Sequence, residues 1–188
     1  MNKHLIAALT AATVALPGYA ADSYTVDPEH TFPSFEVKHF GYSTQRGRFN
    51  KTSGKITLDR TTKTGTVDIA IDVASVNTGM PQLETHLRGE SFFDAAKHPV
   101  IAFRSKDLKF NGDTLVAVNG DLMIRGVIKP VTLNVTGFRC APHPMLKVET
   151  CGADANVTIK RSDFGMNFMV GPVSDDVKLL INVEAMKD

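Results

Sequence analysis

The chain has few cysteines, no tryptophan and no excess of charge of either sign. Its two cysteines exclude a disulfide-dense scaffold and a four-thiolate zinc site. The 21 Lys and Arg residues are balanced by 20 Asp and Glu residues, which excludes the broad basic surface that nucleic acid binding requires. The 188 residues, 43% of them hydrophobic, are therefore typical of one ordinary globular domain.

Long apolar runs are also scarce, and the clearest one lies at the N-terminus. A short basic start precedes an apolar stretch over residues 5–16, and Gly18 and Ala20 place small residues before a cleavage site. This is the layout of a secretory signal peptide, whereas a membrane-spanning helix requires about 20 apolar residues. We therefore expect cleavage of residues 1–20, a single mature domain over residues 21–188, and a periplasmic or otherwise exported location.

Export determines the expected state of the two cysteines. Cys140 and Cys151 flank a segment with two prolines, which is typical of a turn between two strands. An oxidising compartment favours a structural disulfide that joins these strands. A redox-catalytic pair would require the Cys-x-x-Cys spacing, which the chain lacks.

Alternating apolar and polar residues predict that strands make up most of the mature chain. The pattern is clearest over residues 66–73, 131–136 and 177–184. Shorter versions occupy residues 34–40, 55–58, 100–103, 108–110, 114–118, 121–124 and 155–160. Tight turns are expected at Ser53-Gly54, Asn111-Gly112-Asp113 and Asn119-Gly120-Asp121. Many short strands joined by such turns predict an antiparallel barrel or sandwich.

One segment, residues 80–98, breaks this alternation. Leu83 and Leu87 have helical spacing, and Gly89 would end that turn. Ser91 is placed as the N-cap of a second turn. We expect two short helical turns that cross a barrel mouth or lie along one edge.

Motifs for catalysis and metal binding are missing. The sequence has no Gly-x-Ser-x-Gly, no glycine-rich phosphate loop and no His-Glu-x-x-His. The histidines of the mature chain do not pair at metal-ligand spacing, although histidines from distant strands could still meet; they are His30, His39, His86, His98 and His143. The prediction is a protein with no catalytic residues, no metal and no cofactor.

Two features leave alternatives open. The basic stretch around Phe49 would either contact lipid phosphates or form the solvated face of a hairpin; it comprises Arg46, Arg48, Lys51 and Lys55. The inward side chains of a barrel would either pack into a core or enclose a ligand. Both arrangements require the same apolar residues, so alternation alone does not separate them.

A series of short motifs runs in order along the mature chain. They are Tyr24-Thr-Val-Asp27-Pro-Glu-His30, Phe35-Glu-Val-Lys-His39, Arg46-Gly-Arg-Phe49, His86-Leu-Arg88, Phe92-Phe93-Asp94, His98-Pro-Val-Ile-Ala-Phe103 and Arg161-Ser-Asp163-Phe164-Gly165. In this order and spacing they resemble the YceI-like family of exported lipid-binding proteins. The resemblance implies an all-β, extended antiparallel lipocalin-like β-barrel with short helical segments. It also implies binding of a polyisoprenoid chain, including quinones of the ubiquinone type, and no firmly attached catalytic activity.

Under this resemblance, the inward positions become the expected ligand-binding residues. The apolar tail would contact one face of each strand, with two phenylalanines closing the entrance; the set is Phe35, Val37, Val67, Ile69, Ile71, Phe92, Phe93, Val131, Leu133, Leu179 and Ile181. A quinone or phosphate head would require donors near the mouth, for which the candidates are His30, His39, Arg46 and Arg88.

Two other classes of function stay open. An enzyme acting on a bound isoprenoid or quinone would use His39 or His86 as acid or base, and a packed barrel would serve as an interaction protein without ligand. The expected partners are an isoprenoid lipid or quinone and, transiently, a membrane surface. The sequence does not decide between a monomer and a homodimer, nor does it give the tail length or the head group.

Overall fold

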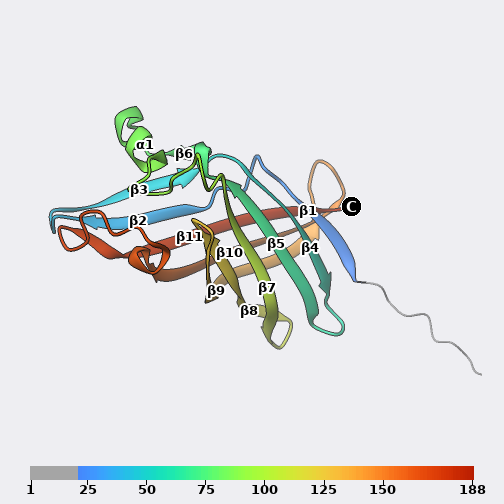
Figure 1. The fold of residues 1–188 in the computed structure, drawn as a ribbon. Coiled ribbons are helices and arrows are strands. Elements are labelled where there is room, and N and C mark those ends of the chain that lie inside the picture. The colour runs from blue at the N-terminus through green and yellow to red at the C-terminus, as the bar shows by residue number, and fades with distance from the viewer. Residues whose placement is uncertain (1–20) are drawn as a thin grey trace, which may run out of the picture.

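The computed structural model describes residues 21–188, so the predicted signal segment, residues 1–20, lies outside the described residues. Strands make up most of the described chain (Figure 1). In chain order the elements are β1 (Asp22–Val26), β2 (Ser34–His39), β3 (Ser43–Phe49), β4 (Thr52–Asp59), β5 (Thr64–Asp72), the 3-10 turn η1 (Val73–Ser75), β6 (Val76–Asn77), the helix α1 (Pro81–Arg88), β7 (Val100–Asn111), β8 (Thr114–Ile124), β9 (Val127–Pro142), β10 (Glu149–Lys160), the 3-10 turn η2 (Arg161–Phe164) and β11 (Val173–Lys187).

Eight of the strands form a closed antiparallel barrel in the order β1-β4-β5-β7-β8-β9-β10-β11, with β11 pairing back to β1. One edge of β11 pairs with β10 along nearly its whole length. The other edge is shared, because residues 173–180 pair with β2 and residues 185–187 pair with β1. The strands β2, β3 and β6 therefore extend the wall beyond the closed ring. The predicted barrel is confirmed, and the sandwich is excluded.

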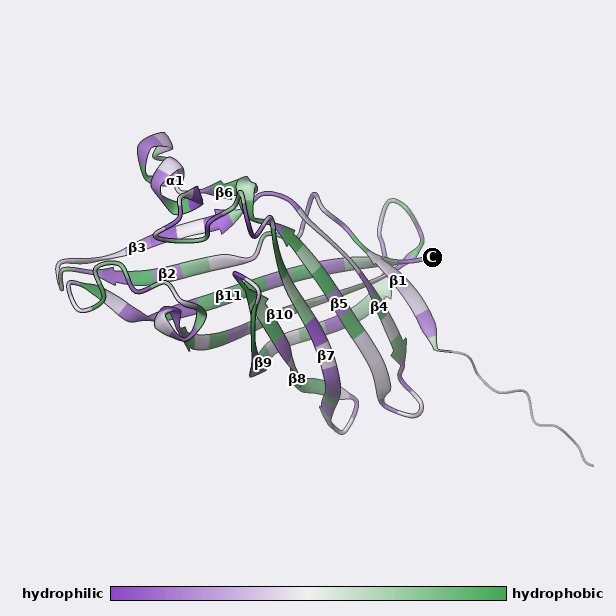
Figure 2. Ribbon diagram, viewed as in Figure 1, coloured by the Kyte–Doolittle hydropathy of each residue, from purple (hydrophilic) through white to green (hydrophobic). Residues whose placement is uncertain are grey.

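Alternation along the strands sets the two faces of the wall, as predicted. Figure 2 shows hydrophobic and hydrophilic residues alternating along β7. On β5, Val67 and Ile69 face the interior, whereas the Asp68 side chain is 57% exposed in an ion pair with Arg104. Asp72 also faces outward, but its carboxylate accepts a hydrogen bond from the Ala74 amide and caps η1.

Two of the predicted turns are wrong. Ser53-Gly54 lies inside β4, and Asn119-Gly120-Asp121 lies inside β8. A Cβ on Gly54 would lie 2.3 Å from the main-chain oxygen of Asp68, and one on Gly120 would lie 2.5 Å from the ring of Phe103. These glycines therefore allow a close approach within the sheet and do not reverse the chain. The predicted turn at Asn111-Gly112 is confirmed, with φ +59° at the glycine.

The first predicted helical turn is confirmed as α1, which ends at Gly89 and lies outside the barrel beside β6 (Figure 1). The second is wrong, because residues 89–99 form a succession of tight turns and no helix. Asp94 has φ +49°, a left-handed conformation that does not continue a right-handed helix. This segment, and not α1, carries Phe92 and Phe93 to the barrel.

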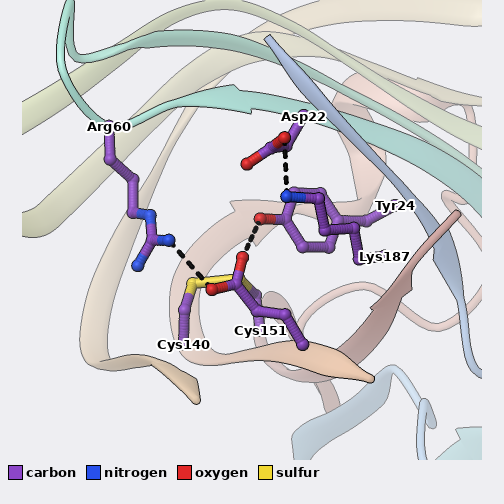
Figure 3. The surroundings of a disulfide bond; sticks show 7 residues. Asp22, Tyr24, Arg60, Cys140, Cys151 and Lys187 are labelled. Atoms are coloured by element: carbon purple, nitrogen blue, oxygen red, sulfur yellow. Dashed lines mark hydrogen bonds and ion pairs between the residues drawn. A yellow bond between two sulfur atoms is a disulfide. The ribbon is translucent and has the colours of Figure 1, made fainter. Parts of the chain in front are cut away.

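The disulfide joins Cys140 on β9 to Cys151 on β10, directly opposite each other in the ladder (Figure 3). The Tyr24 hydroxyl donates to Glu149 at 2.6 Å, and the same carboxylate pairs with Arg60 at 2.9 Å. Burial, reinforced by the hydrogen bond to Glu149, raises the pKa of Tyr24 well above its ordinary value, so its hydroxyl stays protonated. This polar layer closes the β1 end of the barrel, where Tyr24 itself is 1% exposed.

Replacement of both Cys140 and Cys151 by Ser is expected to lower the melting temperature. The disulfide closes a short loop, so its loss should cost about 3 kcal/mol or less. Thermal unfolding of the double variant, beside wild type with and without reductant, measures this. An equal melting temperature in all three samples would show that the disulfide does not stabilise the barrel.

Candidate functional site

An apolar cavity of about 240 Å³ lies inside the barrel. It runs from Tyr24, Cys151 and Ala185 at the β1 end to Val37 and Val173 at the β2 end. The space is far larger than the roughly 10–15 Å³ that one water requires on the same kind of measure, and its lining offers almost no hydrogen-bond partners to water. The cavity can therefore accept hydrocarbon.

Every predicted lining residue except Val131 borders this cavity. Val131 packs against the hydrophobic core instead. The bordering residues come from β2, β5, β9 and β11 and from the segment after α1; they are Phe35, Val37, Val67, Ile69, Ile71, Phe92, Phe93, Leu133, Leu179 and Ile181. Their contact with a ligand stays a prediction.

The interior is hollow and not packed. Val67, Ile69 and Leu179 point inward, yet each is only half-buried. In a packed core, neighbouring side chains would cover such residues almost completely. Phe164, by contrast, is only 1% exposed, because neighbouring side chains do fill the space around it. Volume, which alternation does not encode, therefore decides between the two arrangements that the sequence left open.

Aromatic side chains gather at the β2 end of the cavity. The ring of Phe93 lies 5.4 Å from that of Phe49 and 6.5 Å from that of Phe35, both in edge-to-face contact. The ring of Phe92 lies 5.8 Å from that of Phe168, in the loop before β11. The segment after α1 thus spans from β2 and β3 to the loop before β11.

A seam in the wall lies beside these rings. The pairing of β9 with β10 stops at Asn134 and Asn156, so residues 127–133 of β9 pair only with β8. The guanidinium of Arg125, at the β8–β9 turn, donates to the main-chain oxygens of Glu90 and Phe92. This contact ties the segment after α1 to one side of the seam.

Among residues 21–188, one charged side chain lines the cavity, and the sequence prediction missed it. Arg161 is 4% exposed and donates to the main-chain oxygens of Ser174, Met166, Phe168 and Val173 at 2.8–3.0 Å. Burial lowers the pKa of Arg161, but a guanidinium stays protonated in proteins. Its four acceptors fix the loop before β11. The detectable signal was an arginine directly after the alternating residues 155–160.

The four head-group candidates lie outside the cavity lining and do not converge. His30 is on the β1–β2 connection, and His39 is at the end of β2 with its ring 4.5 Å from that of Phe40. Arg88 is in the last turn of α1. Arg46, on β3, pairs with Glu36 at 2.7 Å. Their contact with a head group stays a prediction.

The basic stretch is mostly neutralised by neighbouring carboxylates. In addition to the pair of Arg46, the Lys51 ammonium lies 3.8 Å from the Asp72 carboxylate, and the Lys55 ammonium lies 2.8 Å from the Asp188 carboxylate. Arg48 stacks over the ring of Phe32 at 4.6 Å. These contacts favour the solvated hairpin face over a phosphate-binding surface.

Asp27 and His30 form a local pair at 2.6 Å, with Glu184 beside them. The hydrogen bond to Asp27 raises the pKa of His30. Burial opposes ionisation of Asp27, but the hydrogen bonds from His30 and from the Glu29 amide leave its pKa below its usual range. Asp27 and His30 thus satisfy each other's hydrogen-bonding groups. The group of Asp27, His30 and Glu184 therefore supports no metal prediction.

No helix among residues 21–188 is long and apolar enough to span a membrane. Residues 24–185 match the YceI-like domain. The chain belongs to the YceI-like family. It is 37% identical over 193 aligned positions to a UPF0312 protein of Yersinia pestis, covering 100% of this chain and 98% of the relative. It is 35% identical to a UPF0312 protein of Pseudomonas aeruginosa, covering 100% of both.

Solved structures share the fold of this YceI-like chain. BcnA of Burkholderia cenocepacia superposes with a TM-score of 0.74 at 27% identity, covering 85% of this chain and 98% of BcnA. The Campylobacter jejuni YceI protein superposes with a TM-score of 0.69 at 32% identity, covering 80% of this chain and 90% of that protein. A domain from Saccharophagus degradans superposes with a TM-score of 0.67 at 18% identity, covering 88% of this chain and 98% of that domain. At this identity the likeness shows a shared fold alone.

Substitution of Ile69 by Trp distinguishes a hollow YceI-like barrel from a packed one. Overfilling a packed core costs about 1–3 kcal/mol, whereas a hollow interior accepts the ring. We expect a small change in melting temperature for Ile69→Trp. Asp68→Trp adds the same ring to the outer face of β5 and is the matched control. A far lower melting temperature for Ile69→Trp than for Asp68→Trp would mean that the interior is filled.

The Asp27–His30 pair predicts a pH dependence of stability. The pKa of His30 is higher in the folded protein than in the unfolded chain, where it is about 6.5. The ion pair with Asp27 therefore stabilises the fold fully below the unfolded pKa, and this stabilisation is lost as pH rises through the folded pKa. The free energy of unfolding should therefore fall as pH rises above about 6.5, and less steeply in His30→Gln. Denaturant titrations across this range measure the slope. His39→Gln is the control, and an equal slope in His30→Gln and wild type would contradict the pair's role.

Proposed function

We propose that this YceI-like protein is an exported carrier of one long isoprenoid lipid, a quinone of the ubiquinone type, with its tail inside the barrel. The observation that supports this is the shape of the cavity. Its lining on β11 extends from Val173 to Ala185, which at a rise of about 3.3 Å per residue is about 40 Å along the strand and, with a strand tilt of about 40°, about 30 Å along the barrel axis. A volume of about 240 Å³ along such a length is narrow, and suits a linear chain better than a compact ligand.

The chemistry of the lining favours a hydrocarbon tail. Apolar surface removed from water contributes about 25 cal/mol per Å². The charged residue that a charged group inside the cavity would meet, among the described lining, is Arg161, whose guanidinium already donates to four main-chain oxygens. We therefore propose that the tail lies inside and that the head group stays at the β2 end. The Saccharophagus degradans neighbour is described as a polyisoprenoid binding domain, which supports this class of ligand.

A binding role is favoured over catalysis by the same lining. The described residues that border the cavity include no histidine and no carboxylate, so no general base faces a bound tail. The hydroxyl of Tyr24 is engaged by Glu149, and Cys151 is held in the disulfide. Export is part of the proposal, supported by the layout of residues 1–20 and by the disulfide.

Organic extraction of the purified full-length product tests the ligand. The protein, secreted by cells that make isoprenoid quinones, should show a bound mass by native mass spectrometry and release a polyprenyl lipid. Ile69→Trp should lose most of this lipid because the ring occupies the tunnel, and Asp68→Trp should keep it. Wild-type protein without extractable lipid would contradict the proposal, as would a short acyl chain as the sole extracted lipid.

A further inference from the structure

Five exposed apolar residues gather at the β2 end of the barrel, and we call them the apolar tip. Tyr42 is 90% exposed and Phe40 44% exposed at the β2–β3 turn. In the loop before β11, Phe168 is 53% exposed, with Met169 and Val170 beside it at 41% and 39%. Monomeric soluble proteins rarely expose contiguous apolar surface without a function for it.

The two loops of the apolar tip form one surface, although they are far apart in the sequence. The Phe40 amide donates to the Pro172 oxygen at 2.8 Å, and His39 pairs with Val173 in the ladder. Figure 1 shows both loops at the end of the barrel opposite the C-terminus. Because Arg161 binds the main-chain oxygens of Phe168 and Val173, the second loop is held in place.

The backbone holds two of these residues in an unfavourable conformation. Phe40 has φ +50° and Met169 has φ +53°, in the left-handed region that favours Gly and Asn. The other non-glycine residues with positive φ in the described chain are all polar: Lys63, Asp94, Arg125 and Lys147. Bulky apolar side chains at these two turns are thus not explained by the local fold.

The apolar tip is continuous with the cavity. Phe168 contacts Phe92, which lines the cavity, and Val37 and Val173 line it directly behind the two loops. Suppose that the tip lies against an apolar phase. A hydrocarbon chain that moved from this phase into the barrel would then contact apolar side chains along its whole path.

The charges around the tip suit an anionic surface. Residues 38–45 and 165–174 contain no acidic side chain. Lys38 bonds to the Thr44 hydroxyl and has no carboxylate partner in the described chain. The five residues of the tip carry no charge, and Lys38 would be attracted to phospholipid phosphates. Of the acidic residues that flank the second loop, Asp175 accepts a hydrogen bond from Ser162 and Asp176 pairs with Lys160, and Asp163 follows Ser162 in η2.

We propose that the apolar tip docks this protein on a phospholipid bilayer, with Phe40, Tyr42 and Met169 inserted at the headgroup–acyl boundary. The route of the tail from bilayer to cavity rests on the proposed function, but the docking does not. A second copy of the chain would use the same surface differently, and self-association is one outcome of the test.

The test is flotation of lipid-stripped, full mature protein with vesicles of phosphatidylethanolamine and phosphatidylglycerol. Wild type should float with the vesicles, and Phe40→Asn/Met169→Asn should bind about tenfold or more weakly. Because Asn accepts a positive φ, this variant should melt no lower than wild type. Met145→Ser/Leu146→Ser removes apolar residues that are even more exposed, at 80% and 59%, from the β9–β10 loop at the other end, and this variant should bind as wild type.

Each result decides the matter. Wild type that stays unbound, or equal binding by the Asn variant, overturns the docking surface, as does equal loss in the Met145/Leu146 variant. A dimer in wild type that the Asn variant abolishes, without vesicle binding, assigns the tip to self-association instead. Extractable isoprenoid without vesicle binding leaves the proposed function standing and removes the docking. Vesicle binding without any extractable isoprenoid leaves the docking standing and removes the proposed function.

Discussion

The shared edge of β11 is the constraint on which the rest of the structure depends. Because β1 and β2 both pair with that edge, one strand closes the eight-stranded ring and also carries an extension of the wall. An eight-stranded barrel is otherwise just wide enough to be filled by its own side chains or to hold one small ligand. The extension lengthens the interior, and this makes room for a chain instead of a compact molecule.

The two ends of the interior are closed by different chemistry. At the β1 end, the Tyr24 hydroxyl, Glu149 and Arg60 form a hydrogen-bonded layer next to the disulfide. At the β2 end, aromatic rings contact one another through edges and faces, with no hydrogen bonds between the rings to break. Hydrogen bonds at this end come from the arginines beside the rings, since Arg125 donates to the Phe92 oxygen and Arg161 to the Phe168 oxygen.

The buried Arg161 links the interior to that end. Burying a guanidinium without a contacting carboxylate is costly, and four main-chain oxygens offset the loss of water. Two of those oxygens, from Met166 and Phe168, belong to the loop that also carries Met169, and the other two, from Val173 and Ser174, lie at the start of β11. The arginine thus holds an apolar loop in a fixed position, which apolar packing alone would not do for residues that face outward.

The sequence by itself determined most of the strands, the first helical turn and the inward face, because alternation and helical spacing are local properties. The sequence did not predict β1 or β3, because β1 has only five residues and β3 has a single apolar side chain, Phe49. It failed at Gly54 and Gly120, where glycine serves a close approach from a neighbouring strand or ring that the local sequence does not reveal. Only the tertiary structure decided that the interior is hollow, that Arg161 borders it, and that Phe40 lies beside the loop of Phe168. Each of these depends on which distant strands pair and on how much volume their side chains leave unfilled, and neither quantity is encoded in any single segment.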